Sequence, residues 1–267
     1  MKFFYDNFDS RDVCGLYTLG HFFTIFLFAL TMATALYFSR KVTDKQIKKL
    51  HWTAAVVITL LEGLKITFRI IKGHPVGDWI PLYYCSLFIY AIWLSLCKVK
   101  FLSRMGYAYM CLGGVGGSLF FSLYPSTSLA IYPLWHPSVW YSFLYHWTMF
   151  YMGVLFLWKG KYVPKSIDGL YYFLFIVAVC IPSFFINEVT GSNCMFLHDP
   201  FKLPILDGLL QFSRWAYIAV VVFAQSVALF WASYFLDYRI RKRRQKKWAE
   251  APAEEVFDEE EIPLKTA

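Results

Sequence analysis

Residues 80–97 read IPLYYCSLFIYAIWLSLC and contain no charged side chain. An α-helix needs about 20 apolar residues to cross the hydrocarbon core of a bilayer, which is roughly 30 Å thick. Further apolar runs of this kind lie near residues 16–38, 52–71, 105–124, 139–158, 167–187 and 209–236. The sequence therefore predicts an all-α, polytopic membrane protein with seven transmembrane helices.

The composition of the whole chain agrees with a membrane protein. Hydrophobic residues make up 58% of it and charged residues only 16%, whereas soluble domains contain roughly 25% charged residues. The net charge of +8 does not indicate a nucleic-acid partner, because the basic residues lie in short clusters between apolar runs and not on one soluble face. The acidic segment before the first run is not typical of a signal peptide.

Basic residues concentrate in alternate connections, as expected of cytoplasmic loops. One side carries the basic residues of connections 39–51, 98–104 and 159–166 and those that follow the last run, whereas the other side carries only Lys2, Arg11, Lys72 and Lys202. We therefore expect the N-terminus outside and the C-terminus in the cytoplasm.

Three regions follow from this topology. We expect an extracytoplasmic segment over residues 1–15, a seven-helix transmembrane domain over residues 16–236, and a cytoplasmic tail over residues 237–267. The tail is first basic and then acidic and lacks apolar periodicity, which predicts disorder. The compact loops fit a multi-pass protein of the cell membrane, such as a bacterial plasma membrane.

Polar and ionisable side chains gather in the outer half of the predicted bundle. The helical rise of 1.5 Å per residue places Cys85, His146 and Glu62 roughly 9, 10 and 13 Å below the outer edge. Lys65 and Arg69 share one helix face with Glu62, and this face must point into the bundle because charges that face lipid are costly. The outer ends of the later helices and the last outer loop add Asn187, Asn193 and Arg214.

This polar group has two interpretations. It is either a structural Glu62–Lys65 pair, with Arg69 extending outward, or a cavity that holds an anionic head group on Lys65, Arg69 and Arg214. The glycine run of the predicted helix over residues 105–124 also has two interpretations. Gly113 and Gly117 suit close helix packing, but they would also leave room for a lipid chain.

The cysteines and histidines allow nucleophilic catalysis but do not indicate a metal site. A thiol becomes a good nucleophile beside a base or a positive charge, and Cys85 and His146 are expected at similar depth. Alternatively, Cys85 is a small buried side chain and His146 a hydrogen-bonded one. No metal-ligand spacing occurs, and Cys14 and Cys194, both expected outside, are free to form a disulfide in an oxidising compartment.

Several motifs in a fixed order resemble the YwaF-like seven-helix integral membrane proteins. They are Glu62 and Lys65, then PLYYC at 81–85, the glycine run before a proline-containing loop, His146, and the segment from Asn187 through NCMFL at 193–197 to Pro200 and Asp207. The resemblance covers residues 16–236, and the related eukaryotic branch, transmembrane protein 164, is described as a cysteine-dependent acyltransferase that remodels ether phospholipids.

This resemblance implies that Cys85 accepts the acyl group and that His146 is a candidate base. The chain departs from the family pattern at two places. Tyr83 stands where a histidine is common, and Asn193-Cys194 replaces the usual Asn-Tyr pair.

The leading hypothesis is a membrane acyltransferase that acts on phospholipid and lysophospholipid through a Cys85 acyl-enzyme. Membrane lipids are then its partners, and no cofactor is required. Lys65, Arg69 and Arg214 would hold the phosphate, with Glu62 balancing their charge. Asn187 or Asn193 would support the oxyanion. The alternative is a transporter or small-ligand-binding membrane protein that uses the same pocket without catalysis, although no inverted repeat is visible.

Overall fold

The computed structural model describes residues 8, 12–74, 76–200 and 203–250, and within these ranges the regular structure is helical, which confirms the all-α fold class. The helices are α1 (Leu19–Phe38), α2 (Asp44–Ile71), α3 (Val76–Trp79), α4 (Leu87–Ser95), α5 (Lys100–Ala108), α6 (Gly114–Leu123), α7 (Pro137–Trp158), α8 (Asp168–Thr190), α9 (Pro204–Phe212), α10 (Arg214–Phe223) and α11 (Leu229–Glu250). Short 3₁₀ or π segments are η2 (Ser39–Lys41), η3 (Tyr109–Gly113), η4 (Cys194–Phe196) and η5 (Ala224–Ala228).

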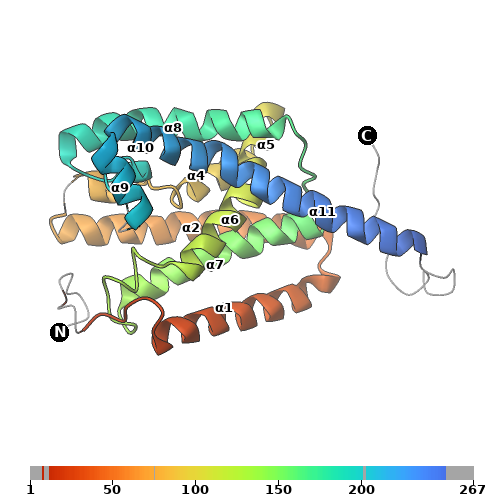
Figure 1. Cartoon of the computed structure of the whole chain (residues 1–267). Coiled ribbons are helices and arrows are strands. Elements are labelled where there is room, and N and C mark those ends of the chain that lie inside the picture. The colour runs from red at the N-terminus through yellow and green to blue at the C-terminus, as the bar shows by residue number, and fades with distance from the viewer. Residues whose placement is uncertain (1–7, 9–11, 75, 201–202, 251–267) are drawn as a thin grey trace.

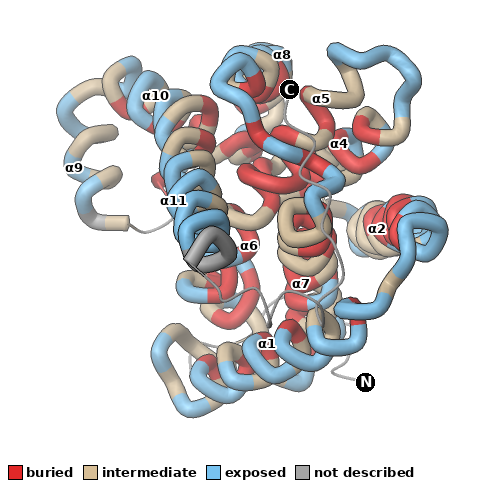
Figure 2. Tube along the Cα trace, turned by 90° about the vertical axis from the view of Figure 1, so that its right-hand side faces the viewer, coloured by how far each residue is buried: buried red, intermediate tan, exposed pale blue. Residues whose placement is uncertain are grey.

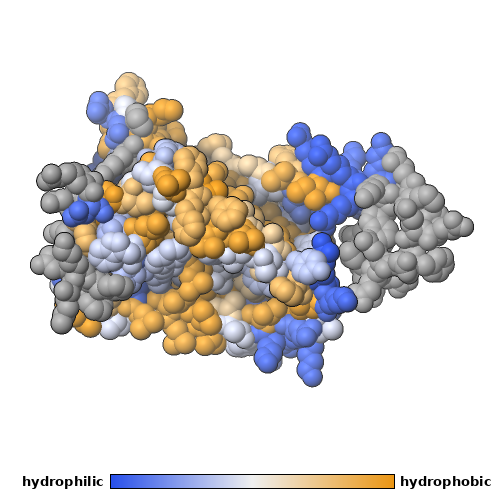
Figure 3. All heavy atoms as spheres, turned by 90° about the horizontal axis from the view of Figure 1, so that it is seen from below, coloured by the Kyte–Doolittle hydropathy of each residue, from blue (hydrophilic) through white to orange (hydrophobic). Residues whose placement is uncertain are grey.

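The long helices run broadly alongside one another, and α11 extends beyond them at one end (Figure 1). Among the described residues, three helical stretches are long and apolar enough to cross a membrane: Leu19–Lys41, Asp168–Thr190 and Arg214–Lys246. The face shown in Figure 3 is mostly hydrophobic across its middle and hydrophilic towards its ends. Such a band is what a lipid bilayer requires of its protein surface, so the chain is a membrane protein.

The sequence provides clear start signals for several long helices. Thr18 caps α1 by accepting a hydrogen bond from the His21 backbone N–H at 3.3 Å. A capping box formed by Thr43 and Gln46 opens α2, and Pro137 occupies the first turn of α7, where its missing N–H has no cost. Thr18 and Pro137 explain why α1 and α7 begin within three residues of the predicted 16 and 139, whereas the capping box starts α2 at Asp44, eight residues before the predicted 52.

The expectation of one helix over residues 80–97 is wrong. Residues 80–86 form turns, and α4 covers only Leu87–Ser95, which is about 14 Å of helix at 1.5 Å per residue and too short to cross a bilayer. Pro81 disfavours a helical conformation at Ile80, but proline is tolerated in the first turn of a helix, so hydrogen bonds from distant groups are needed to keep residues 82–86 irregular. The backbone carbonyls of Leu82 and Tyr84 instead accept from the Met195 N–H at 3.0 Å and from the Tyr109 hydroxyl.

Two other predicted boundaries also change. The run predicted over 105–124 begins earlier, at Lys100, and passes through the π segment η3. The run predicted over 209–236 divides at Ser213, whose extended backbone separates α9 from α10 and whose hydroxyl caps α10 by accepting from the Ala216 N–H at 3.3 Å. Helix α11 then continues through the basic run to Glu250, and the rest of the predicted tail, 251–267, lies outside the described residues.

The basic connections meet at one end of the bundle. Lys161, before α8, forms an ion pair with Asp44 at the start of α2 at 2.5 Å. Arg104 on α5 binds the fully buried Asp168 of α8, with Nε–Oδ1 at 2.7 Å. The Tyr162 hydroxyl also donates to Asp168 at 2.8 Å, and burial raises the pKa of this tyrosine. The connections that follow α1, α4 and α7 therefore lie together.

Buried residues line a common interior among α4, α5, α6, α7 and α8 (Figure 2). Aromatic rings fill much of it: Tyr109 and Tyr172 stack with centroids 6.0 Å apart, and the hydroxyls of Tyr84 and Tyr172 lie 2.6 Å apart. A Cβ atom on Gly113 would lie 2.7 Å from Tyr172, and one on Gly117 would lie 2.9 Å from Tyr84. Both glycines are therefore required for this close packing.

Candidate functional site

A buried ion pair on α2 lies beside the segment around Cys85. Glu62 is 1% exposed and forms an ion pair with Lys65 on its own helix. The Tyr141 hydroxyl of α7 donates to Glu62 Oε2 at 2.7 Å, and Lys65 Nζ donates to Ser86 Oγ at 3.5 Å. Because Ser86 follows Cys85, the ammonium group lies beside the thiol segment.

Cys85 stands two residues before α4, in the irregular segment that follows Pro81. Its thiol is free and partly buried. An irregular backbone is tolerated at membrane depth only where protein or a cavity surrounds it. Here a neighbouring loop and neighbouring helices bind the carbonyls of this segment, so the thiol is held in place without a helix around it.

Cys85 lines an apolar cavity of about 310 Å³. We call this the thiol cavity. Its walls come from α6, α9, α10 and the π segment η5, and its lining includes Gly117, Phe120, Phe121, Thr127, Phe196, Leu203, Leu206, Val220 and Gln225. Phe120 is 52% exposed and Val220 is 43% exposed, which places parts of the lining at the outer surface of the bundle.

A second cavity of about 300 Å³ lies between α2 and the start of α7, and we call it the basic cavity. Lys65, Arg69 and His74 line it together with Tyr141 and Ser142. Thr127 lines both cavities. The cationic and apolar spaces therefore adjoin, with Thr127 at their junction.

His146 lies next to the thiol cavity without reaching Cys85. Its ring stacks on Phe121 with centroids 3.7 Å apart, and Phe121 lines the cavity. Nδ1 lies 2.6 Å from the Ser142 carbonyl oxygen; since a carbonyl only accepts, Nδ1 must carry the proton. Nε2 is buried and has no hydrogen-bond partner among the described atoms, so a neutral His146 presents a lone pair there.

Lys65 is the charge that acts on both candidate catalytic groups. It lies close enough to Cys85 and to His146 for electrostatic interaction with each. The described contacts contain no hydrogen bond between Cys85 and His146. The structure thus groups Glu62, Lys65, Arg69 and Cys85 around the two cavities, with His146 behind Phe121.

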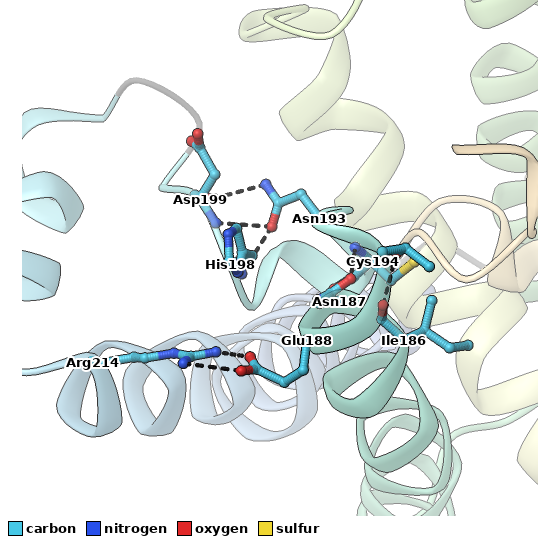
Figure 4. A network of polar contacts seen from close by, with 9 residues as sticks. Ile186, Asn187, Glu188, Asn193, Cys194, His198, Asp199 and Arg214 are labelled. Atoms are coloured by element: carbon cyan, nitrogen blue, oxygen red, sulfur yellow. Dashed lines mark hydrogen bonds and ion pairs between the residues drawn. The ribbon is translucent and has the colours of Figure 1, made fainter. Parts of the chain in front are cut away.

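Asn187, Asn193 and Arg214 form a separate polar cluster (Figure 4). The Asn187 side chain accepts from the Cys194 N–H at 2.7 Å and donates to the Cys194 carbonyl at 2.9 Å. Asn193 accepts from the backbone N–H groups of His198 and Asp199 at 2.9 and 3.0 Å. Arg214 forms a bidentate ion pair with Glu188.

This cluster fixes the turn η4. Met195 and Phe196 have φ of 51° and 57°, a left-handed conformation that is costly for residues with a side chain. Tyr217 donates to the Phe196 carbonyl at 2.6 Å, and Phe196 itself lines the thiol cavity. Asn187 is therefore connected to Cys85 through the turn and not by direct contact.

Gln225 is a polar residue of the thiol cavity that sequence reasoning missed. It sits in η5, and its amide nitrogen donates to the carbonyls of Met195 at 2.9 Å and Val221 at 3.3 Å. Both partners only accept, so the orientation of the amide is determined and Oε1 is the remaining polar atom. Oε1 is buried without a partner among the described atoms. A glutamine within an apolar run was the available signal.

Cys14 and Cys194 are both free thiols in different surroundings. Cys14 lies near Thr18, with Sγ and Oγ1 3.5 Å apart, whereas Cys194 Sγ lies 3.7 Å from the Gly77 carbonyl oxygen. The structure therefore contains no disulfide between them.

The chain was compared with models of protein families, with curated proteins and with solved structures, and only the family models gave a match. A model of the TMEM164 family matches residues 16–238. The chain belongs to the TMEM164 family. The expected relation to transmembrane protein 164 is thereby confirmed, and the match covers all of the helices that build the two cavities.

Proposed function

We propose that this TMEM164-family chain is a phospholipid acyltransferase that works through an acyl-enzyme on Cys85. The single observation that carries the proposal is the position of this thiol on the wall of an apolar cavity that adjoins a basic one at Thr127. A phospholipid has the same two-part chemistry, an anionic phosphate next to apolar acyl chains. The ester that joins them would lie near the junction of the cavities.

In this proposal the polypeptide crosses the membrane seven times, with its N-terminus outside. The meeting of the basic connections at one end of the bundle supports this orientation, because such loops favour the cytoplasmic side. The short helix α4 and its irregular approach would make up the third crossing. Cys85 would then act on lipid from the outer half of the bilayer.

The phosphate would bind Lys65 and Arg69 in the basic cavity, and Glu62 would hold the Lys65 ammonium in position. Ion pairs with phosphate are strong where water is excluded. One acyl chain would occupy the thiol cavity between α6 and α10, which the lipid would enter past the exposed side chains of Phe120 and Val220.

The reaction would proceed in two steps, acylation of Cys85 and transfer of the acyl group to a lysophospholipid. Cys85 loses its proton to a base, and its sulfur attacks the ester carbonyl, so that a thioester C–S bond forms and the ester C–O bond breaks. The lysophospholipid alkoxide leaves with that proton. In the second step the hydroxyl oxygen of another lysophospholipid attacks the thioester carbonyl, so that a new ester C–O bond forms and the C–S bond breaks. The hydroxyl proton passes to the Cys85 thiolate, and the new phospholipid is released.

His146 is the proposed base because its Nε2 is buried, unpartnered and close to Phe121. Proton exchange with Cys85 would require the Phe121 ring to move or the substrate to bridge the gap. Gln225 Oε1 would accept a hydrogen bond from the hydroxyl of the acyl acceptor. Asn187 and Asn193 would support the site by holding η4, and Arg214 by its ion pair with Glu188.

Intact-protein mass spectrometry tests the proposal. The full chain is incubated in phospholipid nanodiscs, and wild type is compared with Cys85→Ser and with Cys180→Ser, a control that removes a buried thiol outside both cavities. We expect a hydroxylamine-labile acyl mass in wild type and in Cys180→Ser but not in Cys85→Ser.

A chase with lysophospholipid then distinguishes turnover from passive acylation. The acyl mass should disappear as acylated product forms. Absence of any adduct, with all three proteins folded, would refute the acyl-enzyme and favour a transporter or ligand-binding protein. An adduct that persists through the chase would refute transfer to this acceptor.

A further inference from the structure

A third cavity lies between α11 and the helices α6 and α7, and it shares no lining residue with the thiol cavity. Its volume is about 300 Å³. We call it the α11 cleft. Its apolar wall includes Val115 and Leu119 of α6, Val154 and Leu157 of α7, and Leu236 and Ile240 of α11.

The cleft reaches the outer surface of the bundle. Leu119 is 38% exposed, Leu236 is 59% exposed and Ile240 is 43% exposed. Gly116 contributes to the floor, where a Cβ atom would lie 2.6 Å from Leu229. The missing side chain therefore lets α6 approach α11 at this point. The mostly apolar lining of the cleft suits a hydrocarbon chain.

One end of the cleft is charged. Arg241 Nε binds Asp237 Oδ2 at 2.7 Å, and Arg244, one turn from Arg241, also lines the cleft and interacts electrostatically with Asp237. Two guanidinium groups against one carboxylate leave one positive charge. Trp158 lies on the lining as well, and tryptophan favours the level of lipid head groups.

We propose that the α11 cleft is a binding site for an anionic phospholipid, with one acyl chain in the apolar part and the phosphate on Arg244. The net positive charge matches the single negative charge of a phosphodiester. Phosphatidylglycerol presents this charge uncompensated, whereas the quaternary ammonium of phosphatidylcholine would be repelled by the basic end of α11. The cleft is distinct from the site at Cys85, because the two share no lining residue even though α6 contributes to both.

Native mass spectrometry of the full chain in detergent tests this site, with phosphatidylglycerol and phosphatidylcholine as titrated probes. Arg244→Gln is the test variant, since the ion pairs among the described residues do not involve Arg244. Arg243→Gln is the matched control because Arg243 has the same charge but does not line the cleft. Leu119→Trp fills the apolar part without changing charge.

We expect wild type to retain phosphatidylglycerol in preference to phosphatidylcholine, Arg244→Gln to weaken phosphatidylglycerol binding about fivefold, and Arg243→Gln to bind as wild type does. Leu119→Trp should weaken both lipids. Equal losses in the two arginine variants would overturn the proposal in favour of a diffuse surface charge. No effect of Leu119→Trp, in a protein with unchanged helical circular dichroism, would also overturn it.

Discussion

Loss of either Glu62 or Lys65 alone is expected to destabilise the fold more than loss of both. The two single substitutions should also lower the free energy of unfolding by different amounts. Removing one member of a buried ion pair leaves an uncompensated charge and typically costs 3–5 kcal/mol. The Glu62 side chain is 2% exposed and that of Lys65 is 18% exposed. The charge left by Lys65→Met is therefore more deeply buried than the charge left by Glu62→Leu.

We expect Lys65→Met to lower the free energy of unfolding by about 4–5 kcal/mol and Glu62→Leu by about 3 kcal/mol. Tyr141→Phe removes a hydrogen bond to a charged group and should cost roughly 1.5–3 kcal/mol. The double variant Glu62→Leu, Lys65→Met leaves no buried charge and places apolar side chains in the same space. It should therefore be more stable than either single variant.

Unfolding of the full chain in mixed micelles, followed by tryptophan fluorescence as the denaturing detergent is increased, measures these differences. Lys48→Met, an exposed lysine on the same helix, is the control and should change stability by less than about 0.5 kcal/mol. A double variant whose loss equals the sum of the single losses would refute the reasoning, because independent sites add and coupled ones do not.

Three further predictions concern the site and the basic end. His146→Ala should slow thioester formation by roughly 10²–10⁴-fold in rapid-quench mass spectrometry, and an unchanged rate would exclude it as the base. Gln225→Leu should slow transfer to lysophospholipid while acyl-enzyme formation continues, so equal slowing of both steps would contradict the assigned role. Asp168→Asn leaves the Arg104 guanidinium without its carboxylate and should lower the free energy of unfolding by about 3 kcal/mol; a change below 0.5 kcal/mol, the range of neutral surface substitutions, would show that the pair does not stabilise the fold.

The sequence predicted the fold class because apolar runs and basic clusters are local properties. The inward orientation of Glu62 also followed from sequence, because a carboxylate that faces lipid has a higher free energy than one inside the bundle. The apolar runs also gave the starts of α1, α7 and α8 within three residues, whereas α2 begins eight residues before its apolar run, at the capping box of Thr43 and Gln46. Each of these features depends on residues within one or two turns of the chain.

The interruption at Pro81 shows where local reasoning stopped. Proline restricts its preceding neighbour, but the irregular segment that follows it is held only because distant groups bind its carbonyls. Those groups are the Tyr109 hydroxyl and the Met195 N–H, which are 25 and 113 positions from their respective acceptors, Tyr84 and Leu82. No periodicity relates such residues, so the segment appeared to be an ordinary helix.

The sequence gives the depth of a residue along its helix. It does not give the rotation of that helix or the position of the neighbouring helices. Cys85 and His146 were therefore expected at one level, but only packing decided that Phe121 stands against the His146 ring. Packing also directed Asn187 towards Cys194 and Gln225 towards the thiol cavity. The sequence alone determined the all-α fold class and the membrane character of the protein; the tertiary structure decided which side chains meet, because contacts between helices depend on side-chain shapes that are far apart in the chain.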